Sequence, residues 1–299
     1  MQNHLHRRTF LKTTATAGAG VCLTGLGGRA RAAETVTVST PAAEEIGWQL
    51  AAQLYTFRRF TFYEALDMIA KLGVKYVEPC FFLRLSKEQP DAKTGPSLKP
   101  ALRKEMKARM AERGIAMPNF YAGLGADPAA NRATFEFARE MGVETIVSEP
   151  PAEAFDGIEK LCDEFEINLA VHNHPKSPKS KYWQPENVLA VCKGRGKRIG
   201  ACCDTGHWVR SGIDPIECLK KMEGRIISVH LKDVVEWGNP KARDVPLGTG
   251  KAKYEAVLGE LHDQGFKGIM SIEYEHDSEK LVDEVGRCLA FVEKTVKGF

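Results

Sequence analysis

The stretch ACCDTGH, residues 201–207, decides how the rest of the chain is interpreted, because an apolar run ends there in ionisable residues. Small and apolar side chains lead up to Asp204, and His207 follows three positions later. One interpretation is a helix N-cap, since Asp is a favoured cap residue and Gly206 favours a turn. The other is a metal site at the carboxyl end of a buried strand.

Short apolar segments alternate with segments of helical periodicity on both sides of this stretch. We expect strands at residues 48–57, 75–81, 115–121, 144–149, 167–174, 199–204, 226–232 and 269–275. Helices are expected near 61–72, 100–113, 129–141, 153–165, 185–194, 214–222, 252–264 and 278–296. Eight strands, each followed by a helix, predict an α/β fold with a single (β/α)8 barrel, a TIM barrel. A doubly wound open sheet is the alternative, but no Gly-rich phosphate loop follows the first strand.

The first 32 residues have the pattern of a twin-arginine signal peptide. The segment HRRTFLK (6–12) places two arginines before an apolar pair, an Ala/Gly/Thr-rich run follows, and Ala30-Arg31-Ala32 has the form of a cleavage site. We therefore expect export by the twin-arginine machinery to the periplasm, a flexible lead-in over 33–46, and the barrel over 47–299. No later stretch has about 18 consecutive apolar residues, so no membrane span is expected.

The charge balance does not favour nucleic acid as a partner. The chain has 42 basic and 39 acidic residues, but five of the basic ones and none of the acidic ones lie in residues 1–32. The remainder, with 37 basic against 39 acidic residues, is slightly acidic.

Seven of the eight cysteines follow Cys22 without the regular spacing of a disulfide framework, and Cys202 and Cys203 are expected to pack in a strand.

Ionisable residues end five of the expected strands. In such a barrel the catalytic groups come from the carboxyl ends of the strands, and residues i and i+2 of a strand share a face. The residues at these ends are Glu149, His172, His174, Asp204, His230, Lys232, Glu273 and Glu275. Charges gathered at one end would repel each other unless a cation compensated them, so we interpret Asp204 as a metal ligand and His207 as its neighbour. A mixed His/carboxylate set suits one divalent ion of the Mn, Co, Zn or Mg kind.

The motifs CDTGH (203–207), VHLKD (229–233) and SIEYE (271–275), with PLGTGKAKY (246–254) between the last two, resemble the xylose-isomerase-like barrel superfamily. This group of sugar phosphate isomerases and epimerases also includes endonuclease IV, and the resemblance covers residues 47–296. It implies one divalent metal held by a Glu, an Asp, a His and a Glu, to which Asp204, His230 and Glu273 correspond. The first Glu has no direct match. Either Glu149 reaches across as the fourth ligand, which we favour, or His172 replaces the missing Glu.

The resemblance implies a metal-dependent isomerase or epimerase that acts on a sugar or keto-sugar through an enediolate. In the family's epimerases the metal-binding glutamates also move the proton, so Glu149 and Glu273 are the expected proton carriers. His172 is a further candidate, which a nearby cation would keep neutral by lowering its pKa, and His174 is expected to face the substrate.

The remaining expected site residues lie around this set. His207 and Lys232 are expected to contact sugar oxygens, or else Lys232 only pairs with Asp233. Glu275 is expected at the substrate or behind a ligand, which it would orient. Glu78, on the second strand, is expected to contact the substrate.

Other functions stay open on the sequence alone. A lyase or hydrolase acting on oxidised (keto) glycosides is the main alternative, since an exported enzyme meets glycosides more readily than sugar phosphates. A nuclease like endonuclease IV is disfavoured, because the second and third strands offer Glu78, Cys80 and Asn119 but no histidine for a metal cluster. A non-catalytic sugar-binding protein would bind without turnover. The particular sugar, the metal and the oligomeric state, including a homo-oligomer, are not determined by the sequence.

Overall fold

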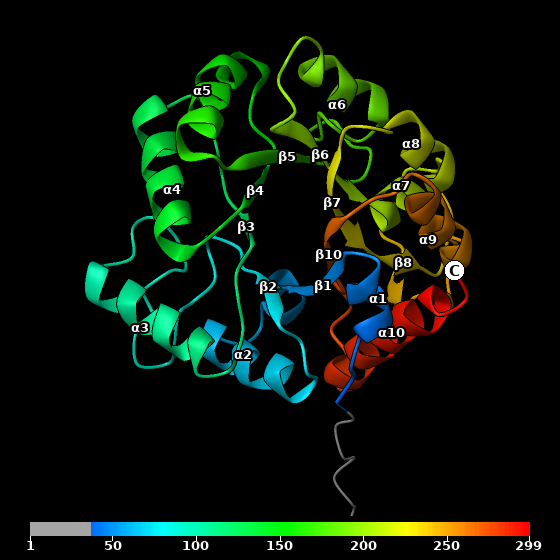
Figure 1. Cartoon of the computed structure of the whole chain (residues 1–299), viewed down its shortest axis with the longest axis horizontal. Coiled ribbons are helices and arrows are strands. Elements are labelled where there is room, and N and C mark those ends of the chain that lie inside the picture. Colours follow the sequence, from blue (N-terminus) through cyan, green and yellow to red (C-terminus); the bar gives the residue numbers. More distant parts are fainter. Residues whose placement is uncertain (1–36) are drawn as a thin grey trace, which may run out of the picture. The chain divides into compact units, whose positions relative to one another are not determined.

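The computed structural model describes residues 37–299, which form one (β/α)8 barrel, as expected (Figure 1). The segment expected to be a signal peptide lies outside the described residues. The eight parallel strands run in the order β2-β1-β10-β7-β6-β5-β4-β3. Their bounds are β1 (Trp48–Gln53), β2 (Tyr76–Glu78), β3 (Asn119–Tyr121), β4 (Thr145–Ser148), β5 (Asn168–His172), β6 (Ile199–Asp204), β7 (Ile226–Leu231) and β10 (Gly268–Ile272). Parallel bridges between Tyr76 and Ala116 and between Cys80 and Tyr121 join β2 to β3, so the sheet closes on itself.

The predicted helices surround these strands (Figure 1). They are α2 (Phe62–Lys71), α3 (Pro100–Ala111), α4 (Pro128–Met141), α5 (Phe155–Phe165), α6 (Pro185–Cys192), α8 (Pro215–Lys221), α9 (Tyr254–Asp263) and α10 (Leu281–Val296). None of the described helices has the length and apolar character that crossing a membrane requires.

Several short elements fill the loops. The helix α7 (Thr205–Arg210) follows β6 directly and is the helix that the N-cap interpretation of Asp204 implied. The sequence did not predict the 3-10 turns η1 (Leu54–Phe57) and η2 (Ala152–Ala154) or the antiparallel pair of β8 (Asp233–Val234) and β9 (Asp244–Val245). The pair and α7 both lie at the carboxyl end of the barrel strands, which we call the mouth.

The expected flexible lead-in is corrected over part of its length. Residues 41–45 form α1 (Pro41–Glu45), which contacts β1 and α10. The Glu293 carboxylate on α10 accepts hydrogen bonds from the backbone N–H groups of Ala42 and Ala43, each at 3.2 Å. A carboxylate at a helix N-terminus satisfies N–H groups that have no partner within the helix and complements the helix dipole.

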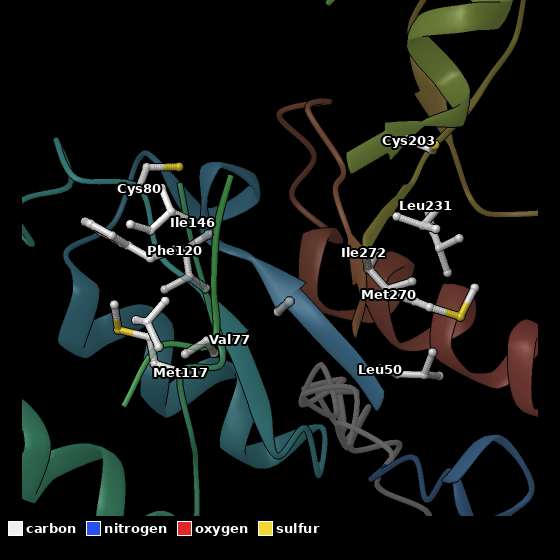
Figure 2. Packing of buried hydrophobic residues seen from close by; sticks show 14 of the residues in the cluster. Leu50, Val77, Cys80, Met117, Phe120, Ile146, Cys203, Leu231, Met270 and Ile272 are labelled. Atoms are coloured by element: carbon white, nitrogen blue, oxygen red, sulfur yellow. The ribbon is translucent and has the colours of Figure 1, made fainter. Parts of the chain in front are cut away.

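Side chains along each strand point alternately to the hydrophobic core outside the sheet and to the interior of the barrel, where the site lies. The main hydrophobic cluster lies between the strands and the helices and includes Leu50, Val77, Phe120, Ile146, Cys203, Leu231, Met270 and Ile272 (Figure 2). Val147, Ala170 and Cys202 form a separate small cluster on the opposite faces of their strands, inside the barrel. By the same alternation, His172 shares the inner face with Ala170, and Asp204 shares it with Cys202. The seven described cysteines are buried and free, as expected.

Candidate active site

Asp204 combines the two roles between which the sequence left a choice. Its Oδ1 caps α7 by accepting a hydrogen bond from the backbone N–H of His207 at 2.8 Å. Its Oδ2 is buried and accepts no aligned hydrogen bond among the described residues, although the Lys232 ammonium lies 3.1 Å away. The cap therefore fixes the carboxylate while one oxygen stays available for the site.

Gly206 and Thr205 connect the CDTGH motif to VHLKD and to KAKY. A Cβ on Gly206 would lie 2.5 Å from Cγ and 2.8 Å from the carbonyl oxygen of Lys232, so only glycine lets α7 approach β7 this closely. The Thr205 hydroxyl donates to the Lys232 carbonyl at 3.1 Å and lies 2.6 Å from the Tyr254 hydroxyl. CDTGH, VHLKD and KAKY are therefore fixed to one another at the mouth.

Lys232 lies at the centre of the charged groups at the mouth. Its fully buried Nζ is 3.1 Å from Asp204 Oδ2, 3.0 Å from Glu273 Oε2 and 3.2 Å from Glu275 Oε1. Burial lowers the pKa of Lys232, but these carboxylates outweigh it and raise the pKa above its usual value. Lys232 is not among the residues that line the cavity described below. It holds two carboxylates that do, those of Glu273 and Glu275, and its expected contact with sugar oxygens stays a prediction.

The alternative interpretation, in which Lys232 pairs with Asp233, is wrong, because the ion pairs of Lys232 are with Asp204, Glu273 and Glu275. The Asp233 carboxylate accepts hydrogen bonds from four backbone N–H groups, those of Val234, Gly248, Gly250 and Ala252, at 2.8–3.1 Å. A Cβ on Gly250 would lie 2.3 Å from Asp233 Oδ1, which explains a glycine in PLGTG. Asp233 therefore shapes the 246–252 loop beside the mouth.

His172 and Glu149 lie at the mouth, but only His172 faces Asp204. His172 is buried, and its Nε2 is 3.6 Å from Asp204 Oδ2, while its Nδ1 is 3.2 Å from Glu149 Oε1. The same Glu149 oxygen is 2.5 Å from His174 Nδ1 and accepts from the Tyr121 hydroxyl at 3.1 Å. Two groups of side chains could each hold a metal ion: His172, Asp204, His207 and Glu273, and separately Glu149, His172 and His174.

His230 lies between two carboxylates. Its Nδ1 is 3.1 Å from Glu273 Oε2, and its Nε2 is 2.7 Å from Glu78 Oε1. Glu78 is fully buried, and its Oε2 accepts from Ser271 at 2.8 Å and from Asn119 at 3.2 Å. Glu78 therefore holds His230, and its expected contact with substrate stays a prediction.

A cavity of about 380 Å³ opens above these side chains. Of the expected site residues, His172, His174, His207, Glu273 and Glu275 line it. Residues that the sequence reasoning missed also line it: Gln53, Tyr55, Cys80, Phe82, Tyr121, Pro175, Arg210 and Pro240.

Arg210 is the most informative of the missed residues. Its guanidinium pairs with Glu275 and Asp244 and donates to the Ala242 carbonyl at 3.0 and 3.1 Å, so it ties the β8–β9 connection to the cavity wall. Its NH1 is also 3.2 Å from His207 Nδ1. The sequence held a signal, because Arg210 lies three residues after His207, on the same face of α7.

The charges of the cluster are set by their neighbours. Burial raises the pKa of Asp204 and of Glu273, but the Lys232 ammonium outweighs it, and both pKa values fall below their usual range. Burial together with the Lys232 charge holds the pKa of His207 well below its usual value, so this imidazole is neutral. Burial lowers the pKa of His172, but the Asp204 and Glu149 carboxylates beside its two ring nitrogens raise it to about 10. These carboxylates raise the pKa of His172, whereas the cation expected at the site would lower it.

The donors present fit a divalent metal ion. His172 Nε2 and Asp204 Oδ2 are both buried and make no aligned hydrogen bond within residues 37–299, although the Lys232 ammonium contacts Asp204 Oδ2 at 3.1 Å, and each lies within reach of further imidazole and carboxylate donors. Unpartnered buried polar atoms are costly unless a ligand satisfies them, and mixed nitrogen and oxygen donors suit Zn, Mn, Co or Mg.

Comparison with known proteins agrees with the fold. Residues 66–293 match the protein family described as "Xylose isomerase-like TIM barrel". A crystal structure of an uncharacterised protein from Parabacteroides distasonis ATCC 8503 is 33% identical, with a TM-score of 0.67, over 83% of this chain and 98% of that one. A D-tagatose 3-epimerase-like protein is similar in fold, at 18% identity and a TM-score of 0.66, over 84% of this chain and 98% of that one.

Among curated proteins, an inosose dehydratase from Geobacillus thermodenitrificans (strain NG80-2) is 29% identical over 140 residues. The match covers 41% of this chain and 46% of that protein. The chain spans less than half the length of the curated relatives it matches.

Proposed function

The chain belongs to the xylose isomerase-like TIM barrel family, and from this premise we propose that it moves a proton at a carbon next to the carbonyl of a sugar, keto-sugar or cyclic keto-polyol. The observation that supports this most is the position of Glu273. Its carboxylate lines the cavity, is ionised, and is held through Oε2 by Lys232 at 3.0 Å and His230 at 3.1 Å. A fixed, ionised carboxylate facing a polar cavity is the arrangement of a general base.

The residues of this chain have separate tasks in the proposed reaction. Glu273 takes the proton from the carbon, and the C–H electron pair forms a C=C bond as the carbonyl oxygen gains negative charge. A divalent ion at the cluster would supply Lewis-acid stabilisation of that charge. His207 and Arg210 present nitrogen atoms to the cavity, where they can bind substrate hydroxyl groups and orient the ring.

The fate of the enediolate divides two candidate activities. In an isomerase or epimerase, a proton returns to a carbon of the enediolate. In a dehydratase, the enediolate re-forms a carbonyl as the neighbouring C–O bond breaks, and the hydroxyl leaves as water after taking a proton. The similarity to a D-tagatose 3-epimerase-like fold supports the first, and the match to an inosose dehydratase supports the second.

Proton NMR in deuterated water separates the two. Purified protein loaded with Mn²⁺ is incubated with D-fructose, D-tagatose or 2-ketoinositol, and with a keto-disaccharide to test the glycoside alternative. We expect loss of the signal of the C–H group next to the carbonyl, with a new epimer or isomer in one case and an unsaturated or diketone product in the other. Absence of exchange in every substrate, with the protein folded and loaded with metal, would contradict enediolate chemistry.

A further inference from the structure

We infer that His172 replaces a carboxylate as a metal ligand in this chain, and that Glu149 acts on the metal only through His172. The ligand set would then be two imidazoles and two carboxylates: His172 Nε2, His230 Nδ1, Asp204 Oδ2 and Glu273 Oε2. His230 takes the place of His207 in the donor group named above, because His207 Nε2 is 3.1 Å from the Lys232 Nζ. The inference rests on the proposed function only in that both use the same site.

The position of His172 Nε2 carries the first step. It is 3.6 Å from Asp204 Oδ2, both atoms are buried, and neither makes an aligned hydrogen bond within the described residues, although the Lys232 ammonium also contacts Asp204 Oδ2 at 3.1 Å. One ion with bonds of about 2.0–2.2 Å to nitrogen and oxygen reaches both atoms at that separation. A direct N–H···O hydrogen bond, by contrast, needs about 2.7–3.2 Å. The pair is therefore spaced for a shared ion.

Glu149 fixes the orientation of that imidazole from behind. Its Oε1 lies 3.2 Å from His172 Nδ1 and is itself held by the Tyr121 hydroxyl at 3.1 Å and by His174 Nδ1 at 2.5 Å. A carboxylate that accepts the N–H of one ring nitrogen leaves the lone pair of the other for a metal. Glu149 is thus a positioning residue, separated from Asp204 by the imidazole ring.

His230 shows the same arrangement with its nitrogens exchanged. Its Nε2 is held by Glu78 at 2.7 Å, and its Nδ1 faces Glu273 Oε2 at 3.1 Å and Asp204 Oδ2 at 3.8 Å. The two imidazoles, from β5 and β7, therefore flank Asp204 on β6, each with a carboxylate behind it.

Metal binding, measured without substrate, tests the inference. Calorimetric titration of the chelator-treated protein with Co²⁺ gives the affinity and stoichiometry, and the visible spectrum of bound Co²⁺ reports the ligands. We expect one ion per chain. His172→Gln should weaken binding at least about 100-fold and change the spectrum, whereas His172→Glu, which offers a carboxylate, should bind within about tenfold of the native protein with an altered spectrum. His262→Gln, on the exposed part of α9, is the matched control and should change neither.

Glu149 separates the positioning role from direct ligation. Glu149→Gln keeps an acceptor for the His172 N–H, so it should weaken Co²⁺ binding by about 10-fold or less and keep the spectrum, while Glu149→Ala should weaken it by about 10–100-fold. A changed spectrum in Glu149→Gln together with a native one in His172→Gln would overturn the inference, as would two ions per chain. Normal Co²⁺ binding without proton exchange on any substrate would instead contradict only the proposed function.

Discussion

At the scale of single residues, Gly206 determines whether the charged cluster can assemble. Gly206→Ala should push Lys232 away from the carboxylates, because the added Cβ would lie 2.5 Å from Lys232 Cγ and 2.8 Å from backbone oxygen. Overpacking of this kind costs about 1–3 kcal/mol of unfolding free energy, and the displaced Lys232 should also reduce activity. Urea unfolding measures the first effect. Gly259→Ala in α9, where a Cβ meets nothing within 4 Å, should be neutral or stabilising, and equal losses in both variants would contradict the account.

Lys232 is the residue on which the charges of the cluster depend. Lys232→Met removes the only ammonium that contacts Asp204, Glu273 and Glu275 in the described part of the chain, which leaves buried carboxylates uncompensated. The chelator-treated variant should lose about 3–5 kcal/mol of unfolding free energy, and Lys160→Met, on the exposed face of α5, should lose less than about 0.5 kcal/mol.

Lys232→Met should also shift the pH dependence of the reaction rate toward higher pH. Lys232 lowers the pKa of Glu273, so its removal raises that pKa. Because the base must be ionised, the acidic limb of the rate profile should move to higher pH. A limb that stays in place, measured on a variant that still binds metal, would show that Glu273 is not the base.

At the scale of elements, the 246–252 loop depends on one carboxylate. Asp233→Asn leaves one acceptor oxygen for four backbone N–H groups and turns an amide N–H₂ toward some of them. The unfolding free energy should fall by about 2–4 kcal/mol, and trypsin should cleave faster after Lys251. The exposed Asp263→Asn is the control. Unchanged cleavage of Asp233→Asn would show that the loop is held by other contacts.

The barrel strands could be predicted from the sequence because each is an apolar segment bounded by helical periodicity. Alternation then placed His172 and Asp204 on the inner faces correctly. The short elements gave weaker signals: α7 has six residues and begins directly after β6, and only the preference of Asp204 for an N-cap indicated it. The lead-in similarly concealed α1, which depends on Glu293 from the far end of the chain.

The sequence could predict a contact in the site only where the contact depends on the strand that carries the residue. The strand ends gave the right residue types, but the direction of a long side chain depends on partners from other strands. Lys232 forms ion pairs with Glu273 and Glu275, and Glu78 contacts His230. Neither contact follows from the sequence of β7 or of β2 alone.

At the scale of the whole molecule, closure of the barrel makes the site. In the sheet β1 and β10 separate β2 from β7, yet Glu78 of β2 holds His230 of β7 across the interior at 2.7 Å. Asp204 and His230 lie at paired positions of β6 and β7, and His230 and Ser271 at paired positions of β7 and β10. The proposed base, its cation and the metal donors are therefore contributed by segments that meet only in the closed barrel.

The central claim is that Glu273 removes the proton, and the exchange rate of the substrate C–H group in deuterated water tests it most directly. The native protein, Glu273→Gln and the exposed Glu255→Gln on α9 are compared on the substrate that the native protein exchanges fastest, with the metal content of each measured. We expect Glu273→Gln to lose at least about 100-fold in exchange rate, the scale of one general base, even in molecules that retain metal, and Glu255→Gln to match the native rate. Native exchange by metal-loaded Glu273→Gln would contradict the account.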